Sequence, residues 1–291
     1  MWMGLRVIIL DIDGTLVNSE KQMMPETKAA LIKAQENGIK IILASGRPTQ
    51  GLVDLGHELR MAEFNGLFVS YNGSKIVDFK TMETVFNQPL SVDEGKAVLE
   101  HMKQFDVMPM IDKGDHMHVN DAFGRIKYKG EDFDIVRHEG HGNKYLLCEQ
   151  HDLAEFLDYE VNKILTAGEP DYLQANYKRM MEPFKETLSC MFTADFYFEF
   201  TAKGIDKAHA LNTVLKPMGY TEDEMIAFGD GMNDLSMLKY VGTGVAMGNA
   251  VCEVKENADH VTASNDEEGI AKALYKYMPE LKPDRIKATT S

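Results

Sequence analysis

Two aspartates near the start of the chain have the spacing of a reaction centre. Asp11 and Asp13 directly follow the apolar run 7–10 and flank the turn into Gly14 and Thr15. A short apolar run of this kind predicts a buried strand of a parallel sheet, so both carboxylates lie at the strand's carboxyl end, where open α/β sheets bind ligands. Two adjacent acids repel each other unless a cation, a proton or a lysine shares the site. The pattern indicates a nucleophile, Asp11, and an acid–base partner, Asp13, with a metal between them; the alternative is a simple turn.

A second acidic cluster repeats this arrangement late in the chain. The apolar run 225–228 ends at a glycine, and Asp230 and Asp234 follow. Residues four apart lie on the same side of a helix, although acids near a helix start are also favoured by the helix dipole alone. Mg²⁺ prefers hard oxygen ligands, and Asp11, Asp230 and a backbone carbonyl provide such a set.

A serine and a lysine are candidates for binding an anion near these acids. Ser45 ends the predicted strand 39–44 and offers a hydroxyl donor, although it is equally a turn residue. Lys207 stands at a predicted helix start, where the helix dipole disfavours a cation unless it faces carboxylates or a phosphate. The alternatives are an exposed surface lysine at 207 and Lys203 as the functional residue.

Alternating strands and helices must position these residues. The sequence predicts a strand–helix–strand–helix–strand series at the start, and the same rhythm returns from residue 206. Such a series predicts an α/β fold with a doubly wound, Rossmann-like parallel sheet. The predicted strands of this core are 7–10, 39–44, 66–70, 225–228 and 243–247.

The rhythm changes between these two parts. A capping box at Ser91 and Glu94 begins a helix, and short strand and helix candidates follow up to about residue 200. We expect a core of residues 1–82 and 196–291 and an inserted α+β cap of residues 83–195, long enough to form its own domain. Five polar cap residues could face the site, although each is more often an ordinary surface residue: His116, His118, Asn120, Arg125 and Lys127.

Composition limits the class of protein. The formal net charge of −15 argues against a nucleic-acid surface. An anionic substrate would need a metal, a few lysines or backbone amides at its binding site. The three cysteines are odd in number and widely spaced, which favours a reducing cytoplasm over disulfides. We see neither a signal peptide nor a membrane span. The sequence leaves open whether the protein is a monomer or a homodimer.

Four motifs together resemble those of a known family. They are Asp11-Ile12-Asp13-Gly14-Thr15, Ser45-Gly46-Arg47, Lys207, and Gly229-Asp230-Gly231-Met232-Asn233-Asp234. In this order, around an insertion, they resemble the haloacid dehalogenase superfamily of phosphatases, in particular its Cof-type subgroup with a type-two α/β cap. The segments 71–73 and 245–250 are similar to further stretches of that subgroup.

The resemblance implies how the acids act. Asp11 is expected to attack phosphorus and form an aspartyl-phosphate. Asp13 is expected to protonate the leaving alcohol and then to accept a proton from water. Mg²⁺ is expected to bind the Asp11 and Asp230 carboxylates and the Asp13 carbonyl, with Asp234 closing the shell directly or through water.

The resemblance also implies the phosphate contacts. Ser45, Lys207 and Asn233 are expected to hold the phosphoryl oxygens. The third motif departs from the Ser-Lys-Gly that is frequent in the subgroup, because Asp206 precedes the lysine; Asp206 can serve as a helix N-cap. The candidates for contacts with substrate or the cap interface are Gly46, Arg47 and Asn72.

The function these expectations describe is hydrolysis of small phosphorylated metabolites, such as sugar phosphates, by a Mg²⁺-dependent phosphatase. A phosphomutase using the same nucleophile and a non-catalytic regulator that binds a phosphometabolite are the alternatives. A regulator would be expected to lack Asp11 or Asp13, and both are present.

Overall fold

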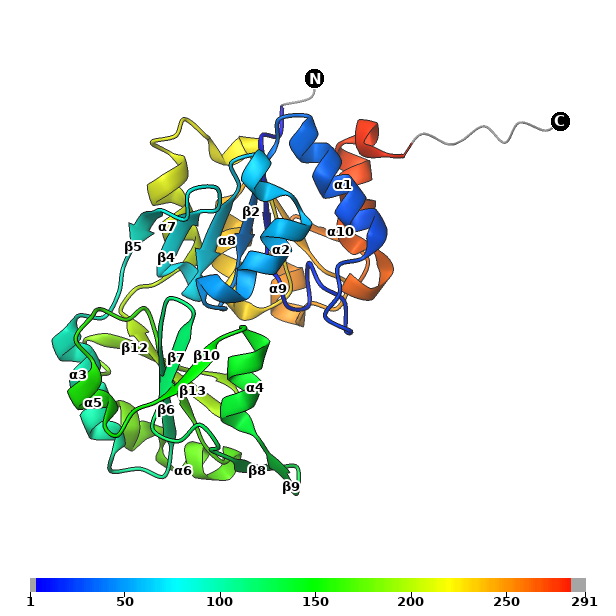
Figure 1. Cartoon of the computed structure of the whole chain (residues 1–291). Coiled ribbons are helices and arrows are strands. Elements are labelled where there is room, and N and C mark those ends of the chain that lie inside the picture. Colours follow the sequence, from blue (N-terminus) through cyan, green and yellow to red (C-terminus); the bar gives the residue numbers. More distant parts are fainter. Residues whose placement is uncertain (1–3, 284–291) are drawn as a thin grey trace.

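Two β-sheets, each covered by helices, make up the chain. The computed structural model describes residues 4–283, and Figure 1 shows the two sheets one above the other. The larger sheet has eight strands in the order β16-β15-β14-β1-β2-β3-β4-β5. Its strands are β1 (Val7–Leu10), β2 (Lys40–Ala44), β3 (Leu67–Ser70), β4 (Lys75–Asp78), β5 (Thr84–Asn87), β14 (Met225–Gly229), β15 (Thr243–Ala246) and β16 (His260–Val261).

The six strands from β16 to β3 are parallel, and β4 and β5 continue the sheet as antiparallel strands. The strand β1 is central and consists only of buried apolar residues, as expected for a parallel strand covered on both faces. The doubly wound α/β core predicted from the sequence is therefore confirmed.

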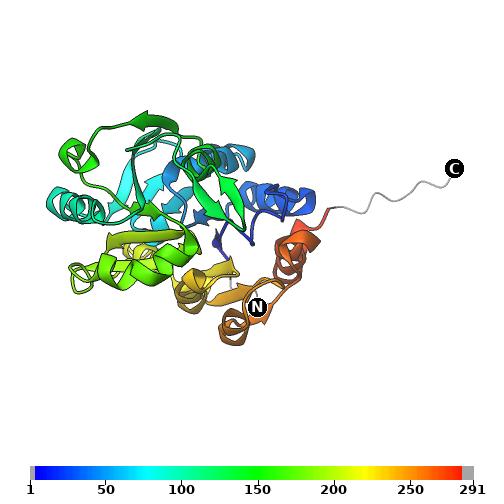
Figure 2. The ribbon, with the colours of Figure 1, turned by 90° about the horizontal axis from the view of Figure 1, so that it is seen from below.

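Alternate side chains of the core sheet pack against different helices. Ile8 and Leu10 lie on the face covered by α1 (Pro25–Glu36), α2 (Val53–Glu58) and α10 (Gly269–Tyr277). Val7 and Ile9 lie on the opposite face. Figure 2 shows α1, in blue, beside α10, in orange-red. The opposite face is covered by α7 (Lys207–Leu215), α8 (Leu235–Tyr240) and α9 (Cys252–Asn257).

The inserted segment forms the second sheet, in the order β10-β7-β6-β11-β13-β12. Helices α3 (Val92–Met102), α5 (Leu153–Phe156) and α6 (Pro170–Met181) pack on one face, and α4 (Ile135–Gly142) packs on the other. The capping box predicted at the start of α3 is present. The strands are β6 (Met108–Lys113), β7 (His116–Val119), β10 (Leu146–Glu149), β11 (Ile164–Ala167), β12 (Leu188–Ala194) and β13 (Tyr197–Ala202), beside a separate hairpin of β8 (Ile126–Tyr128) and β9 (Glu131–Phe133).

Sheet pairing differs from the predicted limits of the insertion. The division at residues 83 and 195 remains a prediction, but β5 belongs to the core sheet and β13 to the second sheet. The strand β5 is short and mostly exposed, and its two apolar residues, Val85 and Phe86, form too short a run to indicate a core strand. The strand β13 is wholly buried but for its last residue, and its sequence alone gives no sign of which sheet it joins.

Two further observations bear on the setting of the chain. Within residues 4–283, no helix has both the length and the apolar character needed to cross a bilayer. Cys148, Cys190 and Cys252 are all free thiols.

Candidate active site

The central strands of the core end together and so bring the two acidic clusters to one edge. Leu10 of β1 pairs with Leu43 of β2 on one side and with Phe228 of β14 on the other. The residues that leave these strands, including Asp11 and Asp230, therefore emerge side by side at the carboxyl edge of the sheet. This is the edge where the sequence predicts the reaction centre.

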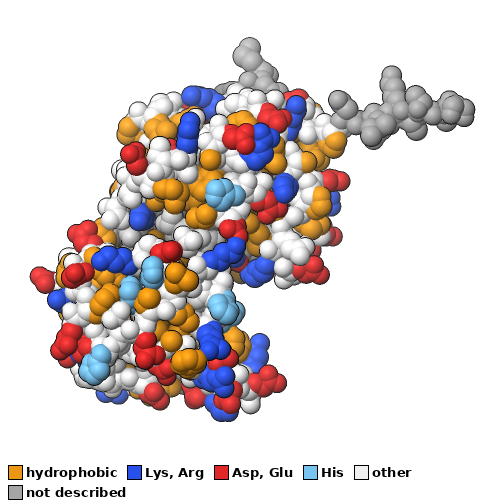
Figure 3. Space-filling model, in the orientation of Figure 1, with side chains coloured by type: hydrophobic (Ala, Val, Ile, Leu, Met, Phe, Trp, Pro, Cys, Tyr) orange, Lys and Arg blue, Asp and Glu red, His pale blue; other side chains and the backbone are white. Residues whose placement is uncertain are grey.

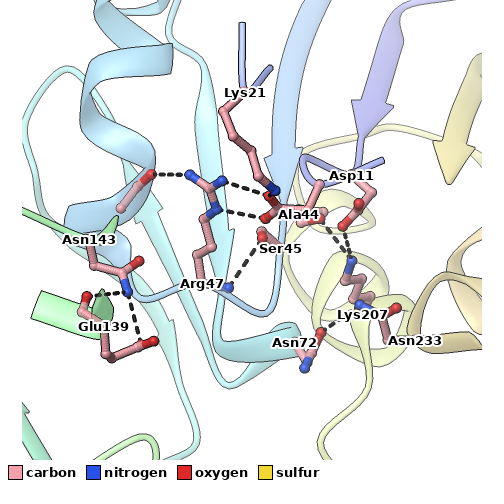
Figure 4. Close-up of polar contacts among 12 residues, drawn as sticks. Asp11, Lys21, Ala44, Ser45, Arg47, Asn72, Glu139, Asn143, Lys207 and Asn233 are labelled. Carbon is pink, nitrogen blue, oxygen red and sulfur yellow. Dashed lines mark hydrogen bonds and ion pairs between the residues drawn. The ribbon is translucent and has the colours of Figure 1, made fainter. Parts of the chain in front are cut away.

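A buried lysine joins the strand ends. The Lys207 ammonium donates hydrogen bonds to Asp11 Oδ1 at 2.8 Å, to Asp234 Oδ1 at 2.6 Å and to the carbonyl oxygen of Ala44 at 2.8 Å. Its side chain is fully buried, whereas Lys203 is exposed and donates to the carbonyl oxygen of Glu186, in the turn before β12. Of the two lysines that the sequence offers, only Lys207 meets the carboxylates (Figure 4).

The start of α7 places this lysine. Asp206 is the N-cap residue, as expected, because its carboxylate accepts the backbone N–H of His209. Gly73 packs on the same turn: a Cβ atom there would lie 2.5 Å from the Asp206 carbonyl oxygen. The loop after β3 thus fixes the turn from which Lys207 points into the site.

Three carboxylates form a cluster able to hold a cation. One oxygen atom from each of Asp11, Asp230 and Asp234 lies within 4.8 Å of the others. Asp234 Oδ2 accepts the backbone N–H groups of Asp230 and Gly231, each at 3.0 Å. Because its other oxygen receives Lys207, Asp234 is held rigidly behind the other two acids.

The turn after β1 packs closely on this cluster. Gly14 has φ +80°, and a Cβ atom there would lie 2.4 Å from an oxygen of Asp230. The Thr15 hydroxyl donates to Asp230 Oδ1 at 2.8 Å, and Asn249 donates to the Gly14 carbonyl. Neither Thr15 nor Asn249 has a predicted role, although both lie within segments that resemble the family.

Electrostatics favour a further positive charge at the cluster. Burial raises the pKa of Asp11, the Asp234 carboxylate raises it further, and Lys207 opposes both. Burial also raises the pKa of Asp230. Since one lysine does not offset three acids, a divalent cation would stabilise their ionised forms.

Asp13 lies in the opposite environment. Arg47 donates from Nε to Asp13 Oδ2 and from Nη2 to Oδ1, both at 2.7 Å, and Lys21 donates to Oδ1 at 2.6 Å (Figure 4). Burial would raise the pKa of Asp13, but these two cations outweigh it and lower the pKa to about 2. Lys21 is a contact that the sequence analysis missed, because nothing in its own neighbourhood marks it.

The remaining candidates line the same cavity as the acids. Ser45 is buried, and its Oγ accepts the backbone N–H of Arg47 at 3.2 Å. Asn72, with φ 55°, donates its backbone N–H to the Ser45 carbonyl and accepts the Asn233 amide at 3.0 Å. A side chain at Gly46 would press on Asn72. The segments around Asp13, Ser45 and Asn233 thus meet at one opening.

These residues face a cavity of about 1480 Å³ between the core and the second sheet. Figure 3 shows the molecule hollowed between the two. The polar residues of the insertion named from the sequence, His116 to Lys127, do not line it; α4, β12, β13 and Lys163, just before β11, supply the cap wall instead. The predicted site residues that line it are Asp11, Asp13, Ser45, Gly46, Arg47, Asn72, Lys207, Asp230 and Asn233, whereas Asp234 lies behind them.

Carboxylates, a buried lysine and hydroxyl and amide donors at the floor of a covered cavity define an enzyme that acts on an anionic group. Comparison with known proteins identifies the family. Residues 8–274 match the family model of haloacid dehalogenase-like hydrolases, and the chain belongs to this family. The resemblance seen in the sequence is confirmed, and the enzyme class is that of a phosphoric monoester hydrolase.

Individual relatives agree over nearly the whole chain. The 5-amino-6-(5-phospho-D-ribitylamino)uracil phosphatase YcsE of Bacillus subtilis is 28% identical, covering 93% of this chain and 94% of its own. A haloacid dehalogenase-like hydrolase of Bacteroides thetaiotaomicron has a crystal structure that is 34% identical, with a TM-score of 0.86 over 93% of this chain and 98% of its own. The subclass IIB sugar phosphatase BT4131 is 26% identical, with a TM-score of 0.75 over 94% of this chain and 98% of its own.

Proposed function

We propose that the protein is a Mg²⁺-dependent phosphatase of small phosphorylated metabolites, sugar phosphates or similar, and that it works through an aspartyl-phosphate. The observation that carries this proposal is the buried Lys207 bridging Asp11 and Asp234 at the floor of the cavity. A fully buried ammonium that holds a carboxylate beside an open cavity suits a nucleophile facing a phosphoryl group.

The donor set fits Mg²⁺. The three clustered acids offer only oxygen atoms, the ligand type that this ion prefers. The Asp11 and Asp230 carboxylates and the Asp13 carbonyl would hold it, with Asp234 completing the shell directly or through water. A bound metal would offset charge on the phosphoryl oxygens.

The chain's own residues would then carry the two half-reactions. Asp11 forms a bond to phosphorus while the bond from phosphorus to the leaving oxygen breaks. Asp13 gives that oxygen a proton and later takes one from the water that cleaves the aspartyl-phosphate. Lys207 favours the ionised, nucleophilic form of Asp11, and Ser45 holds the phosphoryl group.

Asp13 cannot donate a proton in the arrangement described here. Arg47 and Lys21 hold it as a carboxylate, the form that suits the second half-reaction. To protonate a leaving group, Asp13 must give up at least one of these contacts when substrate enters. The substrate itself offers the anionic oxygens that can draw Arg47 or Lys21 away.

The test is phosphate release from an aryl phosphate, with Mg²⁺ and with a chelator. The proposal requires metal-dependent release that falls by at least about 1000-fold in Asp11→Asn. Asp93→Asn, the same substitution at an exposed helix start, is the control and should match the wild type. Substantial activity in Asp11→Asn would contradict the assignment of the nucleophile.

The other functions are outcomes of the same experiment. No release from the aryl phosphate or from a panel of sugar and cofactor phosphates would favour a phosphomutase or a regulator. Trapping a phosphorylated Asp11 would then separate these two, because only the mutase forms it. A cytoplasmic location is part of the proposal, and fluorescence imaging of a tagged chain checks it.

A further inference from the structure

The cap wall of the cavity contains a group of charged and hydroxyl side chains to which the proposed reaction gives no role. Lys163, Tyr197, Glu199 and Glu139 line the same cavity as Asp11 and therefore face the space left for the substrate's leaving group. They come from the inserted segment, on β13, on α4 and just before β11.

The register of the second sheet explains how they meet. Glu199 of β13 pairs with Leu165 of β11, and Tyr197 lies two residues from Glu199 and so on the same face. That face carries α4, because Tyr197 and Leu165 pack in one cluster with its apolar residues. Glu139 of α4 thus joins residues from the distant strands.

Two groups in this cluster lack full hydrogen-bond partners. Lys163 Nζ lies 3.5 Å from the Glu199 carboxylate, which is long for a hydrogen bond, and its side chain is only 12% exposed. The Tyr197 hydroxyl is buried near the Glu139 carboxylate, and burial and this carboxylate both raise its pKa, but it makes no well-aligned hydrogen bond within residues 4–283. Buried polar groups without partners cost free energy, so their position at a cavity wall indicates that a ligand completes them.

The charges of the cluster indicate what kind of ligand this is. Burial lowers the pKa of Lys163, but Glu199, Glu139 and Asp112 outweigh it and raise the pKa, so its positive charge is more than balanced. Two carboxylates, Glu199 and Glu139, face this one ammonium, and burial already raises the pKa of Glu199, so a second phosphate or a carboxylate is disfavoured here. A neutral hydroxyl group can donate to a carboxylate and accept from the ammonium at once.

We propose that Lys163, Glu199 and Tyr197 form a leaving-group subsite that binds the hydroxyl groups of a polyol monophosphate and disfavours substrates with a second anionic group. This inference rests on the proposed function and extends it to specificity. The subsite would act by differential binding: hydroxyl groups satisfy these side chains, whereas a second anion is repelled by Glu199 and Glu139.

The test compares three substrates: a hexose 6-phosphate, the bisphosphate of the same sugar, and an aryl phosphate that lacks hydroxyl groups. Lys163→Met and Tyr197→Phe should each lower the ratio of kcat/KM for the hexose phosphate over the aryl phosphate by about tenfold. Glu199→Gln should raise the ratio of bisphosphate over monophosphate by about tenfold. Lys127→Met, at an exposed ion pair outside the cavity, should change neither ratio.

Two results would overturn the inference. One is a preference of the wild-type enzyme for the bisphosphate. The other is a kcat/KM ratio of hexose phosphate over aryl phosphate that stays constant in folded Lys163→Met and Tyr197→Phe. Because Tyr197→Phe removes a single oxygen atom, it remains informative if Lys163→Met does not fold. Turnover of aryl phosphate with constant ratios rejects the subsite alone and leaves the proposed function standing.

A binding measurement tests the subsite even if the protein turns over none of these substrates. If no substrate is turned over, the proposed function fails, and calorimetry with the hexose 6-phosphate tests the subsite directly. The hexose 6-phosphate should bind about tenfold more weakly to the double variant Asp11→Asn, Tyr197→Phe than to Asp11→Asn alone. Equal binding with and without that second change would reject the subsite.

Discussion

Replacement of the buried lysine tests the electrostatic reasoning most directly. Lys207→Ala removes the cation that bridges Asp11 and Asp234 and leaves both carboxylates in the interior. Breaking a buried ion pair from one side costs about 3 to 5 kcal/mol, because the remaining charge stays buried and unpaired. For a chain of this size we expect the melting temperature to fall by about 6 to 20 °C in metal-free buffer.

The loss of stability in Lys207→Ala should depend on pH, because Lys207 affects the pKa of Asp11. Lys207 opposes the raised pKa of Asp11, so its removal raises that pKa further. A carboxyl group with a raised pKa in the folded state binds a proton that the unfolded chain releases, and stability then falls as pH rises. The loss in Lys207→Ala relative to the wild type should therefore be larger at about pH 8 than at about pH 5.5.

The assay is thermal or denaturant unfolding in chelator at both pH values, followed by phosphate release with Mg²⁺. Lys203→Ala is the matched control, because Lys203 is exposed and distant from the acids. Its unfolding free energy and activity should stay close to those of the wild type. Equal losses in the two variants, or a loss in Lys207→Ala that grows on acidification, would refute the reasoning.

Three other changes test single contacts. Asp230→Asn removes one of the proposed metal ligands and should raise the Mg²⁺ concentration for half-maximal activity at least about tenfold; an unchanged requirement would exclude Asp230 as a ligand. Gly14→Ala forces a methyl group against Asp230 and should lower the melting temperature more than Gly38→Ala, which has a similar φ of +86° but open space, so equal losses would exclude the clash. Tyr71→Phe removes the hydroxyl that donates to the partly buried Asp112 across the two sheets and should cost about 1 to 3 kcal/mol in denaturant unfolding; no loss would mean that this contact adds no stability.

Local sequence patterns were enough to predict the core of the fold. The residues of β1 form an unbroken apolar run, and that run matches the strand from its first residue to its last. The lysine at position 207 was also informative, because a cation at a helix start calls for nearby negative charge. The structure provides that charge in Asp11 and Asp234.

The cap wall could not be predicted in this way. Glu199 comes near Lys163 only through the pairing of β13 with β11, and no local pattern specifies which strands of a mixed sheet become neighbours. Polar residues in the earlier strands, such as His118, are equally plausible from sequence, yet His118 packs beside Phe156, on the face of the sheet away from the cavity. Contacts such as Lys21 with Asp13 depend on loop conformation and are equally hidden.

The two aspartates of the first motif lie in opposite electrostatic environments, although they belong to one short turn. Asp11 is buried beside other acids, which makes its charge costly, and Lys207 together with the proposed metal would offset that cost. Asp13, two residues later, is held ionised by Arg47 and Lys21 at the mouth of the cavity. Environments that push two carboxyl groups in opposite directions are typical of sites that divide nucleophilic and acid–base roles. Because the cations on Asp13 come from loops that border the cavity, a substrate phosphate would compete for them, and the proposed proton transfer would then depend on substrate binding.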